Sequence, residues 1–172
     1  MYIETQRLFA RQLTLDDIIP FVEMQSNEKV MKYILGRPKA KEESINELEK
    51  ILSSYEIISN DFIIMAVVKK DDNQFVGTCA IVKNDDGEHE LGYRFIEKYW
   101  GNRYGQEILN SLVAFALKLP YLSRVVAYVN KNNYLSVKIL DSSELIFIKE
   151  FKESETGDVI RYYKLLQLDY KD

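Results

Sequence analysis

Hydrophobic residues recur with a helical spacing through most of the first 57 residues. Apolar positions three or four residues apart predict helices over Thr14–Asn27, Glu28–Leu35 and Lys41–Ile57. Thr14 is a suitable N-cap for the first of these helices, because its hydroxyl can accept a bond from a free backbone amide. Before them, apolar and polar residues alternate over Arg7–Leu13, which predicts a strand. The chain is therefore expected to begin with a strand followed by helices.

The spacing changes to that of strands after residue 61. The nearly continuous apolar run Phe62–Val68 is typical of a strand covered on both faces. Gln74–Lys83 and Glu88–Phe95 follow as further strands, separated by polar turns at residues 69–73 and 84–87. Short turns of this kind join antiparallel neighbours. These three strands are therefore expected to form an antiparallel sheet.

Helices and strands alternate in the last third of the chain. The pattern predicts helices over Arg103–Leu119 and Asn133–Asp141, and strands over Arg124–Val129, Leu145–Phe151 and Val159–Leu168. The strand at residues 124–129 is joined to that at residues 88–95 through a helix, so the two are expected to be parallel. The whole order predicts an α/β (α+β) fold with a mixed sheet flanked by helices. Residues 1–172 are expected to form a single domain.

Composition and charge narrow the possible functions. The 172 residues are 47% hydrophobic and 29% charged, a balance typical of a soluble globular protein. The net charge is −4 and the pI about 5.2, so no nucleic-acid partner is expected. No apolar run reaches the roughly 20 residues that span a bilayer, and the first eight residues lack the features of a signal peptide. No association with a membrane is therefore expected.

The chain has a single cysteine and a single histidine. Cys79 lies within a predicted strand, so we expect a buried structural thiol rather than a nucleophile. One cysteine excludes an internal disulfide framework and fits a reducing cytoplasm, which is the expected location. One histidine and one cysteine cannot form a zinc site without several carboxylates, and no such spacing is present, so no metal is expected.

A strand, a turn with two glycines and an apolar helix follow one another over Leu91–Glu107. Gly101 and Gly105 let the turn bend and let a ligand come close to the backbone. The helix that opens there presents unpaired N–H groups and the positive end of a dipole, which suits a phosphate. This segment is the one place in the sequence where a phosphate-bearing cofactor is physically indicated.

Four short motifs carry a resemblance to a known family. They are Ile3–Leu8, Glu90–Tyr93, Tyr99–Glu107 and Asn133–Ser136. In this order they resemble the GCN5-related N-acetyltransferase (GNAT) superfamily, and within it the RimJ/RimL-like branch of ribosomal-protein alanine N-acetyltransferases. The resemblance implies a GNAT fold, with a mixed, mostly antiparallel seven-stranded sheet whose central parallel strands splay apart. It also implies an acyltransferase that moves acetyl from acetyl-CoA to a primary amine by direct attack.

The resemblance implies a binding mode for acetyl-CoA, the expected co-substrate. The pantetheine arm is expected in the splay between the parallel strands, where it pairs with the backbone like an added strand. The pyrophosphate is expected on the backbone amides of the glycine turn. The implied cofactor-binding residues are Phe95, Ile96, Trp100, Gly101, Asn102, Arg103, Tyr104, Gly105, Gln106 and Asn133.

Arg103 departs from the family pattern, because a glycine is expected at this position of the turn. Two interpretations stay open. The guanidinium can swing outward and add a charge-assisted contact to a CoA phosphate. Alternatively, the bulky side chain crowds the turn and weakens cofactor binding. A second departure follows Asn133–Ser136, where the family usually has a glycine at the end of the helix and this chain has none.

Transfer from a thioester to an amine needs a deprotonated amine and a proton donor for the leaving thiolate. Many superfamily members use a tyrosine as that donor, but the equivalent position here is Leu140. The resemblance to the RimJ/RimL-like branch makes Ser136 the candidate acid instead. An ordinary helical serine is the alternative interpretation of Ser136, and Tyr134 is the alternative donor in a shifted register.

The candidate general base is Glu90, which lies on the strand beside the splay. A solvated strand carboxylate is the alternative interpretation. His89 has a suitable intrinsic pKa, but its place near a hairpin turn favours an exposed surface histidine. Glu155 is a further possibility, and an amine that is already neutral needs no base.

The sequence is compatible with two classes of acceptor amine. A protein N-terminus is the acceptor that the branch implies, and a small amine such as a polyamine, an amino acid or an aminoglycoside is the alternative. A non-catalytic CoA-binding module with this fold is a rival from another class. The chain is expected to be a monomer or a homodimer, since its apolar final strand is explained equally well by burial within one copy or between two.

Overall fold

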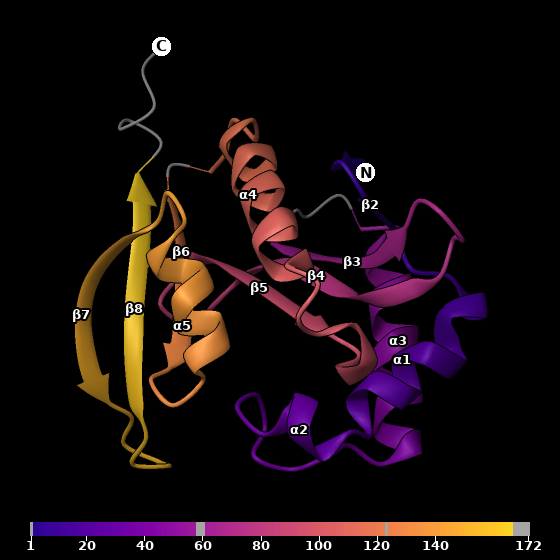
Figure 1. Ribbon diagram of the computed structural model, residues 1–172, viewed down its shortest axis with the longest axis horizontal. Helices are drawn as coiled ribbons and strands as arrows, with labels where there is room; N and C mark the ends of the chain where they lie inside the picture. The colour runs from indigo at the N-terminus through magenta and orange to yellow at the C-terminus, as the bar shows by residue number, and fades with distance from the viewer. Residues whose placement is uncertain (1, 58–60, 123, 167–172) are drawn as a thin grey trace.

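The structure is a computed structural model that describes residues 2–57, 61–122 and 124–166. An eight-stranded sheet runs through the molecule in the order β1-β2-β3-β4-β5-β6-β8-β7 (Figure 1). The strands are β1 (Tyr2–Glu4), β2 (Leu8–Arg11), β3 (Phe62–Lys69), β4 (Phe75–Lys83), β5 (His89–Phe95), β6 (Arg124–Asn130), β7 (Ile146–Lys152) and β8 (Val159–Leu166). The helices are η1 (Leu15–Asp17), α1 (Ile18–Gln25), α2 (Glu28–Met31), α3 (Lys41–Ser54), η2 (Glu97–Tyr99), α4 (Tyr104–Leu117) and α5 (Tyr134–Asp141).

The sheet has one strand more than the seven expected. The additional strand is β1, which pairs antiparallel with β2 from Tyr2 opposite Arg11 to Glu4 opposite Phe9. Three residues are too few for a recognisable alternation of apolar and polar positions, so periodicity does not predict this strand. Each expected strand is present, and the end of the last prediction, at Leu168, lies outside the described residues.

The two central strands are parallel and splay apart. β5 and β6 pair only where His89 faces Val125 and Glu90 faces Val126. Beyond Glu90 the strands diverge, and among the described residues the rest of β5 stays paired with β4 alone, as far as Phe95 opposite Gly77 (Figure 1). All other neighbouring strands are antiparallel. The expected mixed, mostly antiparallel sheet with splayed parallel strands is therefore confirmed.

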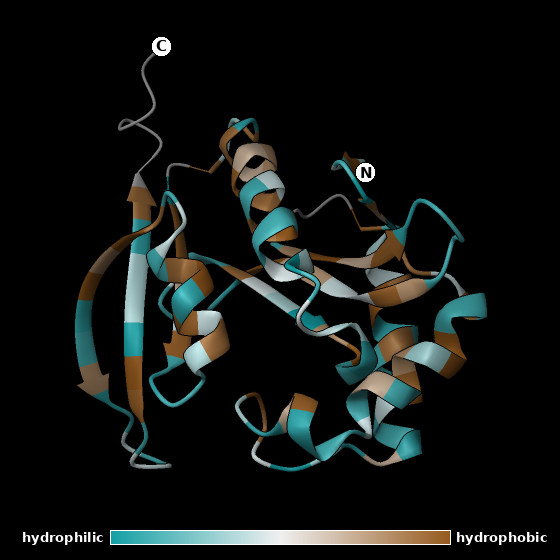
Figure 2. Ribbon diagram, in the orientation of Figure 1, coloured by the Kyte–Doolittle hydropathy of each residue, from teal (hydrophilic) through white to brown (hydrophobic). Residues whose placement is uncertain are grey.

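Helices cover both faces of the sheet. On one face α4 buries Ile108, Leu109 and Leu112 against β4, β5 and β6, with α5 beside it. On the other face α1 and α3 bury residues such as Phe21 and Ile51. Hydrophobic and hydrophilic segments alternate along α1, α3 and α4, as expected of helices with one face on a sheet (Figure 2). The splay between β5 and β6 therefore opens toward a different helical layer on each face.

Helix α5 ends without the glycine that the family pattern leads one to expect. The Ser142 hydroxyl donates to the Lys138 carbonyl at 2.8 Å, and the Ser143 hydroxyl donates to the Leu140 carbonyl at 2.8 Å. The backbone amides of Ser142 and Ser143 also donate to the Ile139 and Leu140 carbonyls, so the last turn of the helix is closed without a glycine. The departure in sequence is therefore compensated locally. No helix in the described ranges is both long and apolar enough to cross a membrane.

Candidate active site

A cavity of about 530 Å³ lies at the splay between β5 and β6. Its walls come from both sides of the sheet: α1 and α3 contribute on one face, and α5 contributes on the other. The polar side chains that line it include Glu47, Glu90, Tyr93, Arg94, Asn133 and Ser136. The structure thus brings the two predicted catalytic residues to one cavity. The cavity connects the two helical layers through the gap in the sheet.

Glu90 lies on the face of β5 that points toward α1 and α3. Leu91 and Phe95 belong to the core beneath α4, and side chains alternate along a strand, so Glu90 and Arg94 face the opposite way. Glu90 is also the last residue of β5 that pairs with β6. Burial raises the pKa of Glu90 to about 7. A carboxylate with this pKa in an open cavity has the properties of a general base at neutral pH.

Ser136 lies on the opposite side of the gap, in the first turn of α5. The Tyr93 side chain lies next to it, and the Tyr93 hydroxyl is buried without a hydrogen bond to any residue that the structure describes. Burial raises the pKa of Tyr93 to about 12, and interaction with Ser136 offsets part of that rise. Leu140 lines the cavity as well. Tyr134 is 73% exposed and is not part of the lining, which leaves no support for the shifted register.

Sequence reasoning missed Tyr93 as a site residue. It alternates with Leu91 and Phe95, so the three side chains share one face of the strand, a pattern typical of core positions. The tyrosine hydroxyl in the middle of this apolar face was the available signal, because a buried hydroxyl normally has a partner. In the structure the ring packs against the core, and Tyr93 is among the residues that line the cavity.

His89 does not take part in the cavity. Its Nε2 lies 3.3 Å from Oδ1 of Asp61, and its ring meets Tyr121 edge-on at 6.3 Å between centroids. The side chain is only 13% exposed, so the expectation of an exposed histidine is wrong. The packing of Asp61 and Tyr121 around it, which involves residues distant in sequence, is the reason. Glu155 is exposed and is not part of the cavity lining either.

The glycine turn before α4 has two residues in the left-handed region. Gly101 has a φ of +80°, a conformation that favours glycine, and Arg103 has a φ of +63°. Arg103 is the N-cap of α4, and the family's preference for glycine at its position is explained by this backbone conformation. Its side chain is exposed and forms no hydrogen bond or ion pair with the described residues. The guanidinium is therefore free to reach a ligand at the start of the helix.

Other side chains of this segment support the turn. The Trp100 indole N–H donates to the Phe95 carbonyl at 2.9 Å, and the Asn102 amide donates to the Tyr99 carbonyl at 2.9 Å. Gly105 is closely packed, since a Cβ there would lie 2.7 Å from Cδ1 of Ile139. Two further predicted cofactor residues make contacts within the protein. Tyr104 lies under the guanidinium of Arg7, and Gln106 bonds to Asn110 and Ser142.

The backbone beside the splay is only partly available to a ligand. The Ile96 amide donates to the Val76 carbonyl at 2.9 Å, and the Phe95 carbonyl accepts from Trp100. Successive amides of a strand point to opposite sides, so the Phe95 amide points toward β6 and into the splay. Asn133 lines the cavity, and its Oδ1 caps α5 by accepting from the Ser136 amide at 3.3 Å.

Two of the family motifs meet in one network outside the cavity. Oε1 of Glu107 accepts bonds from the Thr5 hydroxyl at 2.5 Å and from the Arg7 amide at 2.7 Å. Its Oε2 accepts from Nε of Arg7 at 2.8 Å. The opening motif and the glycine-turn motif therefore share a structural function: together they fasten the first strands to α4.

The fold and the cavity define a class of protein. The structure has a splayed parallel strand pair, a glycine turn at the start of α4, and a carboxylate in the cavity whose pKa is raised to about 7. Residues 7–144 match the family model of the acetyltransferase (GNAT) domain. The chain belongs to this family and is a GNAT N-acetyltransferase.

Known proteins resemble the chain over nearly its full length. An uncharacterized N-acetyltransferase of Bacillus licheniformis is 27% identical over 150 residues, which cover 85% of this chain and 82% of the relative. The crystal structure of a GNAT-family acetyltransferase from Bacillus anthracis has a TM-score of 0.85 at 22% identity and covers 98% and 99% of the two chains. The ribosomal L7/L12 alpha-N-protein acetyltransferase RimL, solved in complex with coenzyme A, has a TM-score of 0.80 at 15% identity and covers 96% and 98%.

Proposed function

We propose that this protein transfers an acetyl group from acetyl-CoA to a primary amine by direct attack, and that the acceptor is a protein N-terminus. The observation that carries the proposal is the cavity through the sheet, with Glu90 toward one helical layer and Ser136 toward the other. The acceptor amine and the leaving thiolate lie on opposite sides of the acetyl group, so the base and the proton donor must also lie on opposite sides.

The residues present fit acetyl-CoA. The start of α4 offers backbone amides and the helix dipole to the pyrophosphate, and Arg103 adds a positive charge with no partner among the described residues. The Phe95 amide faces the splay, where it can pair with the pantetheine arm, whereas the Ile96 amide is used by Val76. When bound, acetyl-CoA supplies the activated acetyl thioester.

The protein supplies the proton transfers. Glu90 accepts a proton from the acceptor amine, directly or through a water molecule, and its raised pKa makes it an effective base near pH 7. Ser136 donates a proton toward the departing sulfur. The neighbouring Tyr93 hydroxyl, kept protonated by burial, can hydrogen-bond to Ser136 and replace the proton that it gives up.

A protein N-terminus is favoured by the likeness in fold to RimL, an alpha-N-protein acetyltransferase. The motifs at Ile3–Leu8 and Asn133–Ser136 resemble the same branch. We also propose a reducing cytoplasmic location, which a buried free thiol at Cys79 supports. Burial raises the pKa of Cys79 to about 12, so this thiol is inert rather than catalytic.

The first experiment measures thermal unfolding with increasing acetyl-CoA, followed by a panel of amine acceptors with detection of the released thiol. We expect a concentration-dependent rise in Tm and transfer to peptide N-termini. A Tm that does not move would contradict the transferase. Binding without release of thiol to any acceptor would favour the non-catalytic module, and transfer only to polyamines, amino acids or aminoglycosides would replace the proposed acceptor.

The role of Ser136 is tested separately. Ser136→Ala should lower kcat by about 10- to 100-fold with acetyl-CoA affinity retained, because the proton donor is lost and the binding site is not. Ser53→Ala is the matched control, since Ser53 is a helical serine whose hydroxyl bonds to the Glu49 carbonyl outside the cavity. An unchanged kcat for Ser136→Ala would remove Ser136 from the mechanism and leave Tyr93 as the candidate donor, tested by Tyr93→Phe.

A further inference from the structure

Arg94 brings a positive charge to the acceptor side of the cavity. It lies four residues beyond Glu90 on the same face of β5, and its side chain is part of the cavity lining. Nη1 of Arg94 donates to Oε1 of Gln25 at 3.2 Å. A guanidinium has five N–H donors, and Arg94 makes no other hydrogen bond with the residues that the structure describes. Most of its donors are therefore available to a ligand.

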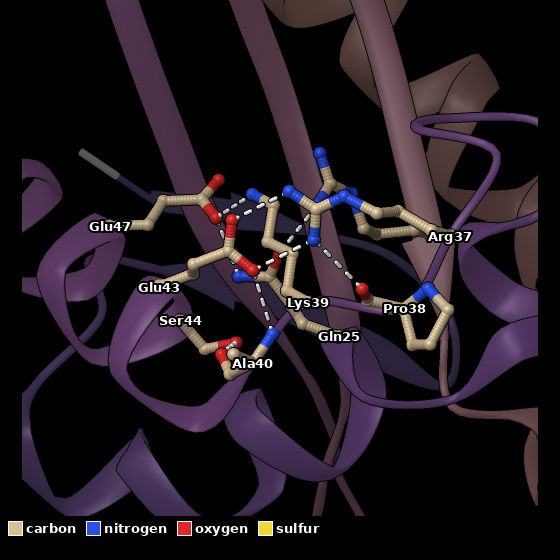
Figure 3. Close-up of polar contacts among 9 residues, drawn as sticks. Gln25, Arg37, Pro38, Lys39, Ala40, Glu43, Ser44 and Glu47 are labelled. Atoms are coloured by element: carbon tan, nitrogen blue, oxygen red, sulfur yellow. Dashed lines mark hydrogen bonds and ion pairs between the residues drawn. The ribbon is translucent and has the colours of Figure 1, made fainter.

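Arg94 shares the carboxylate that interacts with it with a second cation. Glu47 is the carboxylate that interacts with it, but Glu47 already pairs with Nζ of Lys39 and accepts a bond from Nε2 of Gln25 at 2.8 Å. Figure 3 shows Glu47 held between Lys39 and Gln25. One carboxylate thus serves two cations, and neutral Gln25 stands between it and Arg94. Burial lowers the pKa of Arg94 and the charge of Glu47 offsets only part of that effect.

The surroundings make an unbalanced charge costly and an incoming anion favourable. Apolar side chains of Phe21, Ile34 and Ile51 form nearby walls of the same cavity. Coulombic attraction is stronger in such surroundings than in water, and an unpaired buried charge is expensive. An anionic ligand that reached Arg94 would therefore gain more here than on the open surface.

The strand between the two charged residues is open. Gly92 lies between Glu90 and Arg94 on the same face, and a Cβ built on Gly92 would meet no atom within 4 Å. The Cα atoms of Glu90 and Arg94 are separated by four residues of extended strand, about 13 Å. An acceptor can lie over Gly92 with its amine at Glu90 and another group at Arg94.

We propose that the acceptor is a peptide-like amine that carries a carboxylate, which Arg94 binds while Glu90 receives the amine. Allowing for contact at each end, amine and carboxylate are about 6–10 Å apart, the reach of a dipeptide or tripeptide. The carboxylate comes either from an acidic side chain at the second or third position of a protein N-terminus or from the free end of a short peptide. This inference rests on the proposed function, because it names the acceptor of the same site.

The test compares peptides that differ in one charge. Ala-Glu-Ala-Ala and Ala-Ala-Glu-Ala, both amidated at the C-terminus, are compared with their glutamine counterparts, and Ala-Ala is compared with Ala-Ala-amide. Calorimetric binding to the CoA-saturated protein and the rate of thiol release are both measured. We expect the charged member of a pair to bind about 10- to 100-fold more tightly. The pair that shows the preference identifies the source of the carboxylate.

Two variants move the preference in opposite directions. Arg94→Gln should abolish the preference for the charged peptide. Acetyl-CoA should still raise the Tm of this variant, which also shows that the variant is folded. Glu47→Gln should strengthen the preference, because the carboxylate that interacts with Arg94 is neutralised. Glu49→Gln is the matched control, since Glu49 is exposed on the same helix and is not part of this cavity.

Several results would overturn the inference. These are equal affinity for charged and neutral peptides, absence of binding by every peptide, or a preference that survives Arg94→Gln. If Arg94→Gln does not fold, Glu47→Gln decides by the direction of its change. A different result would overturn the proposed function. In that case charged peptides would bind in a manner that depends on Arg94, but no acceptor would release thiol.

Discussion

Several residues of the site occupy environments that lower the stability of the fold. Glu90 and Arg94 are ionisable groups in a cavity with apolar walls, and neither forms an ion pair among the described residues. The Tyr93 hydroxyl is buried without a hydrogen-bond partner among the described residues, and Arg103 holds a left-handed conformation. Each feature lowers stability, and all lie at the splay or at the turn beside it. Their common location supports a binding and catalytic function for this region.

The pH dependence of the reaction should follow Glu90. Glu90 acts as a base only when its carboxyl group is deprotonated. We therefore expect kcat/KM to rise through about pH 7 and then level off with respect to this group. Glu90→Gln should lower kcat and remove the ionisation near pH 7, and Glu49→Gln should keep it. The measurement is a pH–rate profile for each variant with one acceptor. A wild-type profile that persists in Glu90→Gln would exclude Glu90 as the base.

The same ionisation predicts a change in stability. The folded protein raises the pKa of Glu90 above its unfolded value, so the folded state binds the proton more strongly between about pH 4.5 and pH 7. Stability from this group therefore falls as the pH rises through that window. Glu90→Gln removes this loss of stability. The Tm of the variant minus the Tm of the wild type should therefore be larger at pH 8 than at pH 5.

Arg103 links stability to cofactor binding. A residue with a side chain in the left-handed conformation costs about 1–2 kcal/mol, and glycine at this position removes that cost. Glycine also raises the conformational entropy of the unfolded chain, which offsets about 0.4–1 kcal/mol of the gain in stability. Arg103→Gly should therefore raise the free energy of unfolding by about 0.5–1 kcal/mol and weaken acetyl-CoA binding by about 3- to 10-fold. Arg103→Lys is the control that keeps both the strain and the charge. Equal or tighter acetyl-CoA binding by Arg103→Gly would favour the crowding interpretation instead.

At the scale of elements, the hydrophobic periodicity predicted structure that depends on residues close together in the sequence. It missed structure that depends on contacts between residues far apart in the sequence. The run Phe62–Val68 and the alternation in Glu88–Phe95 were sufficient because each segment is long enough to reveal its period. Strand β1 is too short to do so, and its place is fixed by pairing with β2. In the site, Glu90 and Ser136 were predicted through motifs. The approach of Arg94 to Gln25 was not predictable, because it joins β5 to α1 across the fold.

The network around Glu107 should hold the first strands to α4. Glu107→Ala removes the acceptor of three hydrogen bonds from Thr5 and Arg7, and we expect a loss of about 2–3 kcal/mol in the free energy of unfolding. Glu23→Ala is the control, since its contact with Lys98 is long and exposed and should contribute little. Chemical denaturation measures both.

The pH dependence checks the cause of that loss. Burial alone would raise the pKa of Glu107, but the bonds from Thr5 and Arg7 outweigh it and lower the pKa. The stabilisation is therefore fully present above about pH 4.5, the ordinary value, and is lost as the pH falls through the lowered pKa. A difference between wild type and Glu107→Ala that stays constant down to pH 2.5 would contradict this explanation.

At the scale of the whole molecule, the sheet consists of two parts with a narrow join. On one side β1 to β5 form a continuous antiparallel sheet, and on the other β6, β8 and β7 form a second one. In the described part of the chain the two parts pair only at His89 with Val125 and at Glu90 with Val126, and α4 packs across both. A ligand that fills the splay would complete the connection. Cofactor binding should therefore stabilise the join more than it stabilises either part.

Hydrogen exchange measures this effect directly. With saturating acetyl-CoA, we expect slower amide exchange in Tyr93–Phe95 and at the start of α4, because amides that face the splay and the anion site gain a partner. The paired amides of β3 and β4 are the internal control and should change little, since each strand already has a neighbour on both sides. Uniform slowing across the whole sheet would mean that the cofactor stabilises the protein only by raising its global unfolding free energy. Slowing confined to the splay and the helix start would mean that binding closes a preformed gap, and because Glu90 lies at the edge of that gap, cofactor binding would then also fix the base in place before the acceptor arrives.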